Sequence, residues 1–138
     1  AVKIAGKVKN FELSEEIISA REAKKFDRFI HLAIHAAHEA LNDANLLPIK
    51  EKLDPSNIGC LMGVGIGGLP AIEKTQTTFL ERGPRRVSPF FIPSIIPNMA
   101  PGVINLLFGF EGAGACSLRT AACVPIITSD IIEERTPS

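Results

Sequence analysis

Residues 58–83 read IGCLMGVGIGGLPAIEKTQTTFLERG, and this stretch decides the fold class. Residues 58–64 are a short apolar run that leads into glycines, which is typical of a buried strand in a parallel sheet. Residues 69–82 have the pattern of a helix, with Pro70 in the first turn and Gly83 just past the end. A strand, a glycine turn and a helix in this order predict an α/β fold.

The sequence before this stretch predicts a strand and two helices. Residues 1–11 alternate apolar and polar side chains, which is typical of a half-buried strand. Ser14 precedes two glutamates and an apolar pair and indicates the start of a helix. Residues 22–45 carry apolar side chains at three- and four-residue steps and predict a long amphipathic helix that stops before Pro48. We expect residues 46–57 to form a polar loop.

The sequence after it is rich in proline. Residues 84–93 contain three prolines and predict an ordered loop. Residues 94–108 are apolar but contain Pro97 and Pro101, so any helix there must kink or begin late.

Composition restricts the classes of partner. The chain of 138 residues is close to the size of one ordinary domain. It is 46% hydrophobic with a mean hydropathy of +0.20, which favours a core element of a larger body or an oligomer subunit. Fifteen basic and fifteen acidic side chains cancel, so we expect neither nucleic acid nor an anionic membrane as a partner. No apolar run approaches the roughly 18 residues of a membrane span, and no signal-peptide pattern is present.

The cysteines indicate a reducing compartment. Cys60, Cys116 and Cys123 are a small and odd number, which does not suggest a disulfide framework and fits the cytoplasm. They form no CxxC pair, so we expect no zinc site.

The glycine turn allows two interpretations. Gly63, Gly65 and Gly68 satisfy the G-x-G-x-x-G pattern of a dinucleotide site, in which a pyrophosphate would meet a helix N-terminus. No acidic residue ends a second strand about 20 positions on, and the turn follows a long helix and a loop instead of the first strand. The alternative is a glycine-lined bend where backbone segments pack closely, and we favour it over nucleotide binding.

Three histidines lie on the predicted long helix. His31 and His35 are four residues apart and could share a metal ion, while His38 and Glu39 follow one turn later. The H-E-x-x-H spacing is not met and no firm third ligand is present, so we expect polar side chains beside an apolar stripe and no metal.

Four motifs in one order carry a resemblance to a known family. They are GVGIGGL at 63–69, GPRRVSPFFIP at 83–93, NMAPG at 98–102, and Phe108-Gly109. Together they resemble the N-terminal half of the β-ketoacyl-acyl-carrier-protein synthases of the type II kind, over about residues 4–112. The resemblance implies a thiolase-like αβαβα sandwich, present here in part. It divides the chain into a partial ketoacyl synthase domain at 1–112 and a divergent tail at 113–138.

The same resemblance implies a function. Members of this family join an acyl group to a malonyl unit by decarboxylative condensation, in the elongation cycle of fatty acid synthesis. The implied partners are acyl carrier protein and a second copy of the chain, and no cofactor is implied besides the phosphopantetheine of the carrier. The resemblance fades from about Ala113, and the catalytic histidines of the family belong to a C-terminal half that the resemblance does not reach, so we expect a fragment. A catalytically inactive remnant that binds only an acyl chain or a subunit is the alternative.

The resemblance also assigns site residues. Ile66 matches the residue that gates the acyl tunnel, with Gly65 and Gly67 on either side. Phe91 matches a residue that closes the acyl pocket across the dimer, and Ile96 is a further expected acyl contact. The nearest match to the nucleophilic cysteine is Cys123 in Thr120-Ala121-Ala122-Cys123, and Cys116 falls too early. Pro125 still permits a helix to start at Cys123, where a thiol would be activated.

Overall fold

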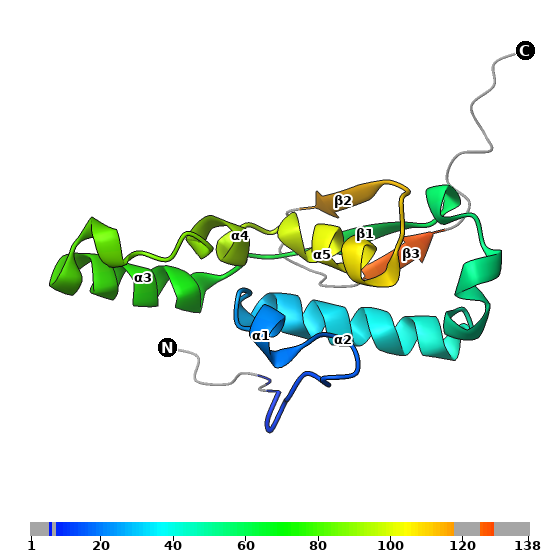
Figure 1. The fold of residues 1–138 in the computed structure, drawn as a ribbon, viewed down its shortest axis with the longest axis horizontal. Helices are drawn as coiled ribbons and strands as arrows, with labels where there is room; N and C mark the ends of the chain where they lie inside the picture. The colour runs from blue at the N-terminus through cyan, green and yellow to red at the C-terminus, as the bar shows by residue number, and fades with distance from the viewer. Residues whose placement is uncertain (1–5, 7, 118–124, 129–138) are drawn as a thin grey trace, which may run out of the picture.

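The structure is a computed structural model that describes residue 6, residues 8–117 and residues 125–128. In chain order, its elements are α1 (Ala20–Ala23), α2 (Arg28–Asp43), η1 (Leu47–Lys52), η2 (Pro55–Asn57), β1 (Gly59–Gly63), α3 (Leu69–Arg82), η3 (Pro84–Arg86), α4 (Phe91–Ile95), α5 (Met99–Phe108), β2 (Gly114–Ser117) and β3 (Pro125–Thr128). The predicted α/β class is confirmed. α2 runs alongside the sheet, whereas α3 extends away from it (Figure 1).

The sheet has the order β2-β1-β3, so the predicted strand is central. β1 pairs with β2 in parallel, which brings Cys60 opposite Gly114 and Met62 opposite Cys116. On its other edge β1 pairs with β3 in the antiparallel direction, which the sequence did not predict. Both partner strands lie within the segment 113–138.

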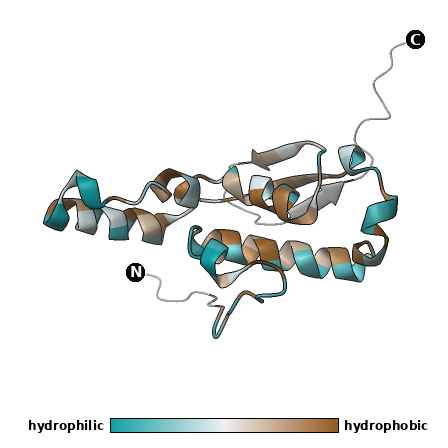
Figure 2. Cartoon of the chain, in the orientation of Figure 1, coloured by the Kyte–Doolittle hydropathy of each residue, from teal (hydrophilic) through white to brown (hydrophobic). Residues whose placement is uncertain are grey.

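The core lies between the sheet and the helices α2 and α5. The apolar stripe of the long helix is confirmed, since Ile30, Ile34 and Leu41 are all buried on α2. α5 contributes Ile104 and Phe108 to the same cluster. Figure 2 shows α4 and α5 as mostly hydrophobic, whereas the far end of α3 is hydrophilic.

The predicted start of the long helix is wrong by six residues. α2 begins at Arg28 because the Asp27 side chain accepts a hydrogen bond from the Arg28 backbone amide and caps the helix. The preceding α1 is a separate short helix that Ser19 caps in the same way, with Glu22 as donor.

The predicted helix start at Ser14 is also wrong. The backbone amide of Ile17 donates to the Ser14 carbonyl at 3.1 Å, which closes a turn instead of a helix.

The predicted N-terminal strand is wrong in its described part. Residues 8–11 contain no strand, and the rest of the predicted element lies outside the described residues except for residue 6. Side-chain contacts hold this segment on α2 instead. Nη2 of Arg28 donates to the Val8 carbonyl at 2.8 Å, and the Phe11 ring meets His35 edge-on at 5.4 Å between centroids.

The helices after β1 begin and end where proline and glycine allow. α3 spans the predicted range, with Pro70 in its first turn and Gly83 at its C-cap with a φ of 78°. α5 begins late, at Met99, as the prolines required. The loop expected at 46–57 contains η1 and η2, which begin at prolines. The loop expected at 84–93 contains η3 and the start of α4 (Phe91–Ile95), so this part of the prediction is wrong; Pro93 is tolerated there because it lies in the first turn of the helix. None of the helices in the described ranges has the length and apolar character that a membrane crossing requires.

Candidate functional site

The turn between β1 and α3 is packed against the C-terminal end of α4. The Gly68 amide donates to the Ile95 carbonyl at 3.1 Å. Gly67 has a φ of 87°, and a Cβ there would collide with the same carbonyl oxygen. A Cβ on Gly68 would lie 2.9 Å from the Ile95 Cα. The glycines therefore permit a close backbone contact, as the favoured interpretation predicted.

A carboxylate already lies at the N-terminus of α3. Oδ2 of Asp27 accepts a hydrogen bond from the Ala71 amide at 2.9 Å, across 44 residues of sequence. A dinucleotide would place its pyrophosphate against these first-turn amides. The Asp27 carboxylate competes for that position with the same sign of charge, which argues against nucleotide binding.

The predicted acyl-contact residues lie in two places. Gly65, Ile66 and Gly67 form the turn itself, and the Ile66 side chain is 70% exposed at its tip. Ile96 is half-buried and directly follows the residue whose carbonyl contacts Gly67. The contact with Ile95 therefore brings the chain next to Ile96 beside the turn. Phe91 lies at the start of α4.

A cavity of about 530 Å³ opens between the α1–α2 junction, α3 and the segment 86–94. Five cationic side chains line it, namely Lys24, Lys25, Arg28, Lys74 and Arg86. Among the described residues on its wall, Asp27 is the only acid. Phe90 and Phe91 supply an apolar part of the wall, and the Lys25 ammonium lies 5.6 Å from the centroid of the Phe90 ring. The cavity therefore combines anion-attracting charge with apolar surface.

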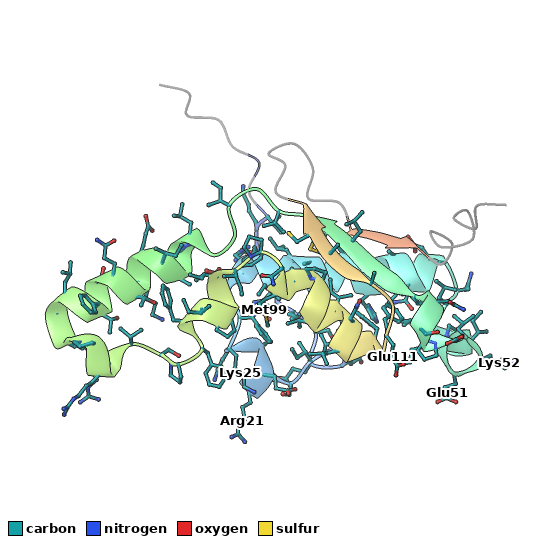
Figure 3. All side chains as sticks on the ribbon, turned by 90° about the horizontal axis from the view of Figure 1, so that it is seen from above. Arg21, Lys25, Glu51, Lys52, Met99 and Glu111 are labelled. Carbon is teal, nitrogen blue, oxygen red and sulfur yellow. The ribbon has the colours of Figure 1, made fainter. Side chains whose placement is uncertain are left out.

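Sequence reasoning missed this cationic cavity because the chain has no net charge. A local signal exists in the spacing of four cationic residues, because Lys24 and Lys25 each lie three or four residues from both Arg21 and Arg28. Figure 3 shows Arg21 and Lys25 close together on one side of the molecule, far from Lys52. The contributions of Lys74 and Arg86 depend on the tertiary fold.

An apolar groove of about 470 Å³ lies between α3 and the segment 84–91. Its lining residues are Ile72, Thr75, Gln76, Phe79, Pro84, Val87 and Phe91. Phe79 is 49% exposed, although it is large and aromatic. Phe91 lines both this groove and the cationic cavity.

Neither of the described cysteines lies at the start of a helix, where a thiol would be activated. Cys60 is buried on β1, and burial raises the pKa of its thiol to about 11. Cys116 is half-buried on β2. The predicted nucleophile, Cys123, lies outside the described residues.

The histidines make separate contacts. Nε2 of His31 donates to the Ala23 carbonyl at 2.8 Å, and Nε2 of His35 lies 3.6 Å from a Glu39 carboxylate oxygen. His38 stacks on Phe108 at 6.3 Å between ring centroids. Within the described ranges, no group of three or more His, Cys, Asp or Glu side chains could hold a metal ion.

Comparison with known proteins gives consistent matches. The sequence model described as "Beta-ketoacyl synthase, N-terminal domain" matches residues 2–123. A 3-oxoacyl-[acyl-carrier-protein] synthase 2 of Synechocystis sp. is 41% identical over 122 residues, which are 88% of this chain and 29% of that protein. The synthase 2 of Staphylococcus aureus is 40% identical over 88% of this chain and 30% of its own length. The chain thus spans under a third of the length of these relatives.

A solved structure agrees with the sequence matches. It is a type II polyketide ketosynthase in complex with its acyl-carrier protein and bound to a hexaketide. The superposition has a TM-score of 0.70 at 25% identity and covers 83% of this chain and 31% of that one. The fold is therefore a partial thiolase-like fold.

Proposed function

The chain belongs to the β-ketoacyl synthase family, and we propose that it acts as a 3-oxoacyl-[acyl-carrier-protein] synthase in fatty acid chain elongation. The substrates are acyl and malonyl groups carried as thioesters on acyl carrier protein. The reaction needs no metal or nicotinamide, and we place it in the cytoplasm.

The proposed chemistry proceeds through an acyl-enzyme. A cysteine thiolate attacks the acyl thioester carbonyl, and the phosphopantetheine thiol leaves. The malonyl thioester then loses carbon dioxide, and the carbanion attacks the acyl-enzyme and releases the cysteine. We assign the nucleophile to Cys123, because Cys60 is buried with a raised pKa and Cys116 lies within β2. His31, His35 and His38 have no part in this chemistry.

The observation that carries the proposal is the cationic cavity beside the glycine turn. The phosphopantetheine arm contains a phosphate diester, which is an anion, and a long acyl chain, which is apolar. Lys25, Lys74 and Arg86 in one cavity provide complementary charge for a phosphate. Asp27 contacts both the cavity and the first turn of α3, so the charged surface and the turn that carries Ile66 are adjacent.

We assign the acyl chain to the apolar side chains near the turn. Ile66 and Ile96 are the proposed contacts, with Gly65 and Gly67 allowing the close approach of the backbone. Each buried CH₂ contributes about 0.8 kcal/mol, so a long chain binds without polar recognition. Phe91 is the proposed contact across a homodimer, in which the apolar groove along α3 is covered by a second copy.

The acyl-enzyme is tested by mass. The purified chain is incubated with a long-chain acyl carrier thioester, and its intact mass and peptide map are recorded. An acyl adduct on Cys123 that disappears in Cys123→Ala supports the proposal. The matched control is Cys116→Ala, which should still be acylated. An unmodified wild-type chain would contradict acyl-enzyme formation by this chain.

Carrier binding is tested by charge reversal. Lys25→Glu combined with Arg86→Glu should weaken binding of acyl carrier protein by about tenfold or more at low salt, and added salt should weaken wild-type binding. Lys52→Glu is the control, since Lys52 is exposed at the other end of the molecule (Figure 3). Equal losses of affinity in the cavity variant and in the control would show that the cavity is not part of the surface that binds acyl carrier protein.

The second candidate function is a non-catalytic module that binds an acyl chain or a partner subunit. The apolar groove along α3 favours it, because Phe79 and Ile72 leave large apolar side chains partly uncovered there, which is typical of a surface that a partner covers. Two results would select this function. One is acyl binding without any adduct on Cys123. The other is a stable dimer that shows no condensation with malonyl carrier thioester.

A further inference from the structure

Asp27 uses both carboxylate oxygens on two different helices. Oδ1 accepts from the Arg28 amide at the start of α2, and Oδ2 accepts from the Ala71 amide at the start of α3. The N-terminus of each helix carries partial positive charge, and the single anion between them stabilises both ends. The residue therefore joins two helices that β1 and the long 44–58 connection separate in the chain.

The glycine turn is held by two anchors. On one side the Gly68 amide donates to the Ile95 carbonyl at 3.1 Å. On the other, Asp27 holds the Ala71 amide at 2.9 Å, and its Oδ2 lies 3.0 Å from where a Cβ on Gly68 would be. The Ile95 anchor is a backbone group that any sequence would provide. The second anchor exists only because residue 27 is an aspartate.

Ile66 lies in the turn that leads directly into these anchors. Its neighbours in the turn, Gly65 and Gly67, have no side chains with which to restrain it. Ile66 itself is 70% exposed, so few contacts of its own fix its position. The turn backbone therefore places the side chain.

From this geometry we infer that Asp27 is a positioning residue that sets the place of Ile66 and thereby the selectivity for acyl-chain length. This inference rests on the proposed function for the acyl contact, whereas the positioning itself rests on the hydrogen bonds alone. Neutral replacements cannot serve both helices. The amide of asparagine offers one acceptor oxygen, and the hydroxyl of serine caps α2 well but cannot also reach Ala71.

The first measurement is amide hydrogen exchange on the full chain. In Asp27→Asn and in Asp27→Ser, the amides of residues 65–72 should exchange about tenfold faster. Loss of a helix cap lowers the free energy of local opening by an amount that corresponds to about a tenfold change in the opening equilibrium. Exchange in α5 should be unchanged. Asp54→Asn is the matched control, because Asp54 caps η2 in the same way at a distance from the turn. Unchanged exchange at 65–72 in both Asp27 variants overturns the inference. The serine variant keeps the α2 cap, so the exchange measurement can still be made on it if the asparagine variant does not fold.

The second measurement compares two acyl probes, hexadecanoyl- and hexanoyl-pantetheine. Displacing Ile66 should weaken binding of the long probe by about tenfold, equivalent to losing two buried CH₂ groups, and leave the short probe nearly unchanged. Asp27→Glu, which keeps the charge, should recover part of the loss. Equal losses of binding affinity for both probes would indicate that Asp27 has a merely structural role, and would overturn the inference that it sets the selectivity for chain length. A wild-type chain that binds neither probe contradicts the proposed function, and the exchange measurement still decides the positioning.

Discussion

The backbone of Gly67 lies directly against the carbonyl oxygen of Ile95, with no room for a side chain between them. The contact joins the turn after β1 to the C-terminal end of α4. It requires a left-handed φ of 87° at Gly67, a conformation that other residues adopt only at a cost. The glycines of this turn are therefore not equivalent.

Gly67→Ala should destabilise the chain by about 2–4 kcal/mol, from backbone strain together with the collision at Ile95. Gly65→Ala is the matched control, because its Cβ would meet no atom within 4 Å and its φ is not positive. Urea unfolding followed by circular dichroism measures both. Equal stability of the two variants would show that the close contact does not hold the turn.

The two faces of α5 should respond differently to truncation. Ile104 is fully buried in the core, whereas Leu106 is 83% exposed two residues later. Ile104→Ala should lower the free energy of unfolding by about 2–5 kcal/mol because it leaves a cavity. Leu106→Ala should change it by no more than about 0.5 kcal/mol. Thermal or urea unfolding of the two variants checks the difference, and comparable losses would contradict the packing of α5 on α2.

The sequence predicted those elements whose local signals agree. The strand before the glycines and α3 were placed correctly because Pro70 and Gly83 mark the two ends of the helix. The start of α2 was missed because the apolar spacing continues across residues 22–27, while the capping by Asp27 decides the boundary. The strand expected at residues 1–11 depended on a distant pairing partner, which alternation alone does not reveal.

The candidate site was predictable to a smaller extent. Gly65, Ile66, Gly67, Phe91 and Ile96 were expected to contact the acyl chain, and that role stays a prediction, although Ile96 directly follows the residue that packs on Gly67. The cationic cavity combines side chains from three separate segments, so the overall charge gave no indication of it. The link from Asp27 to Ala71 spans 44 residues and follows only from the fold. The assignment of Cys123 stays a prediction.

Cys60 should be protected from thiol reagents in the folded chain. Burial raises the pKa of its thiol from 9.0 to about 11, so at pH 8 its thiolate fraction is lowered about a hundredfold. Labelling with iodoacetamide and peptide mapping should show slow modification of Cys60, which becomes fast in urea.

The same shift has a consequence for stability at high pH. The unfolded thiol ionises near pH 9.0 while the folded one keeps its proton to about 11. Its contribution to the free energy of unfolding is therefore fully present below pH 9.0 and is lost as the pH rises through about 11. Fast labelling of Cys60 at pH 8 without denaturant would contradict its burial.

The pKa of Asp54 should depend on the hydroxyl of Ser56. A carboxylate oxygen of Asp54 accepts from the Ser56 hydroxyl at 2.7 Å and from its backbone amide at 3.0 Å. These bonds, the hydroxyl first, hold the pKa of Asp54 below its ordinary 3.8, against a smaller opposing effect of desolvation. The cap at η2 is therefore fully formed above pH 3.8 and is lost as the pH falls through the lowered value. Ser56→Ala should raise the pKa towards 3.8, and Ser56→Thr, which keeps a hydroxyl, should leave it low. Titration of the Asp54 carboxyl carbon by NMR measures both variants. The same pKa in wild type and Ser56→Ala would leave the backbone amide as the sole cause.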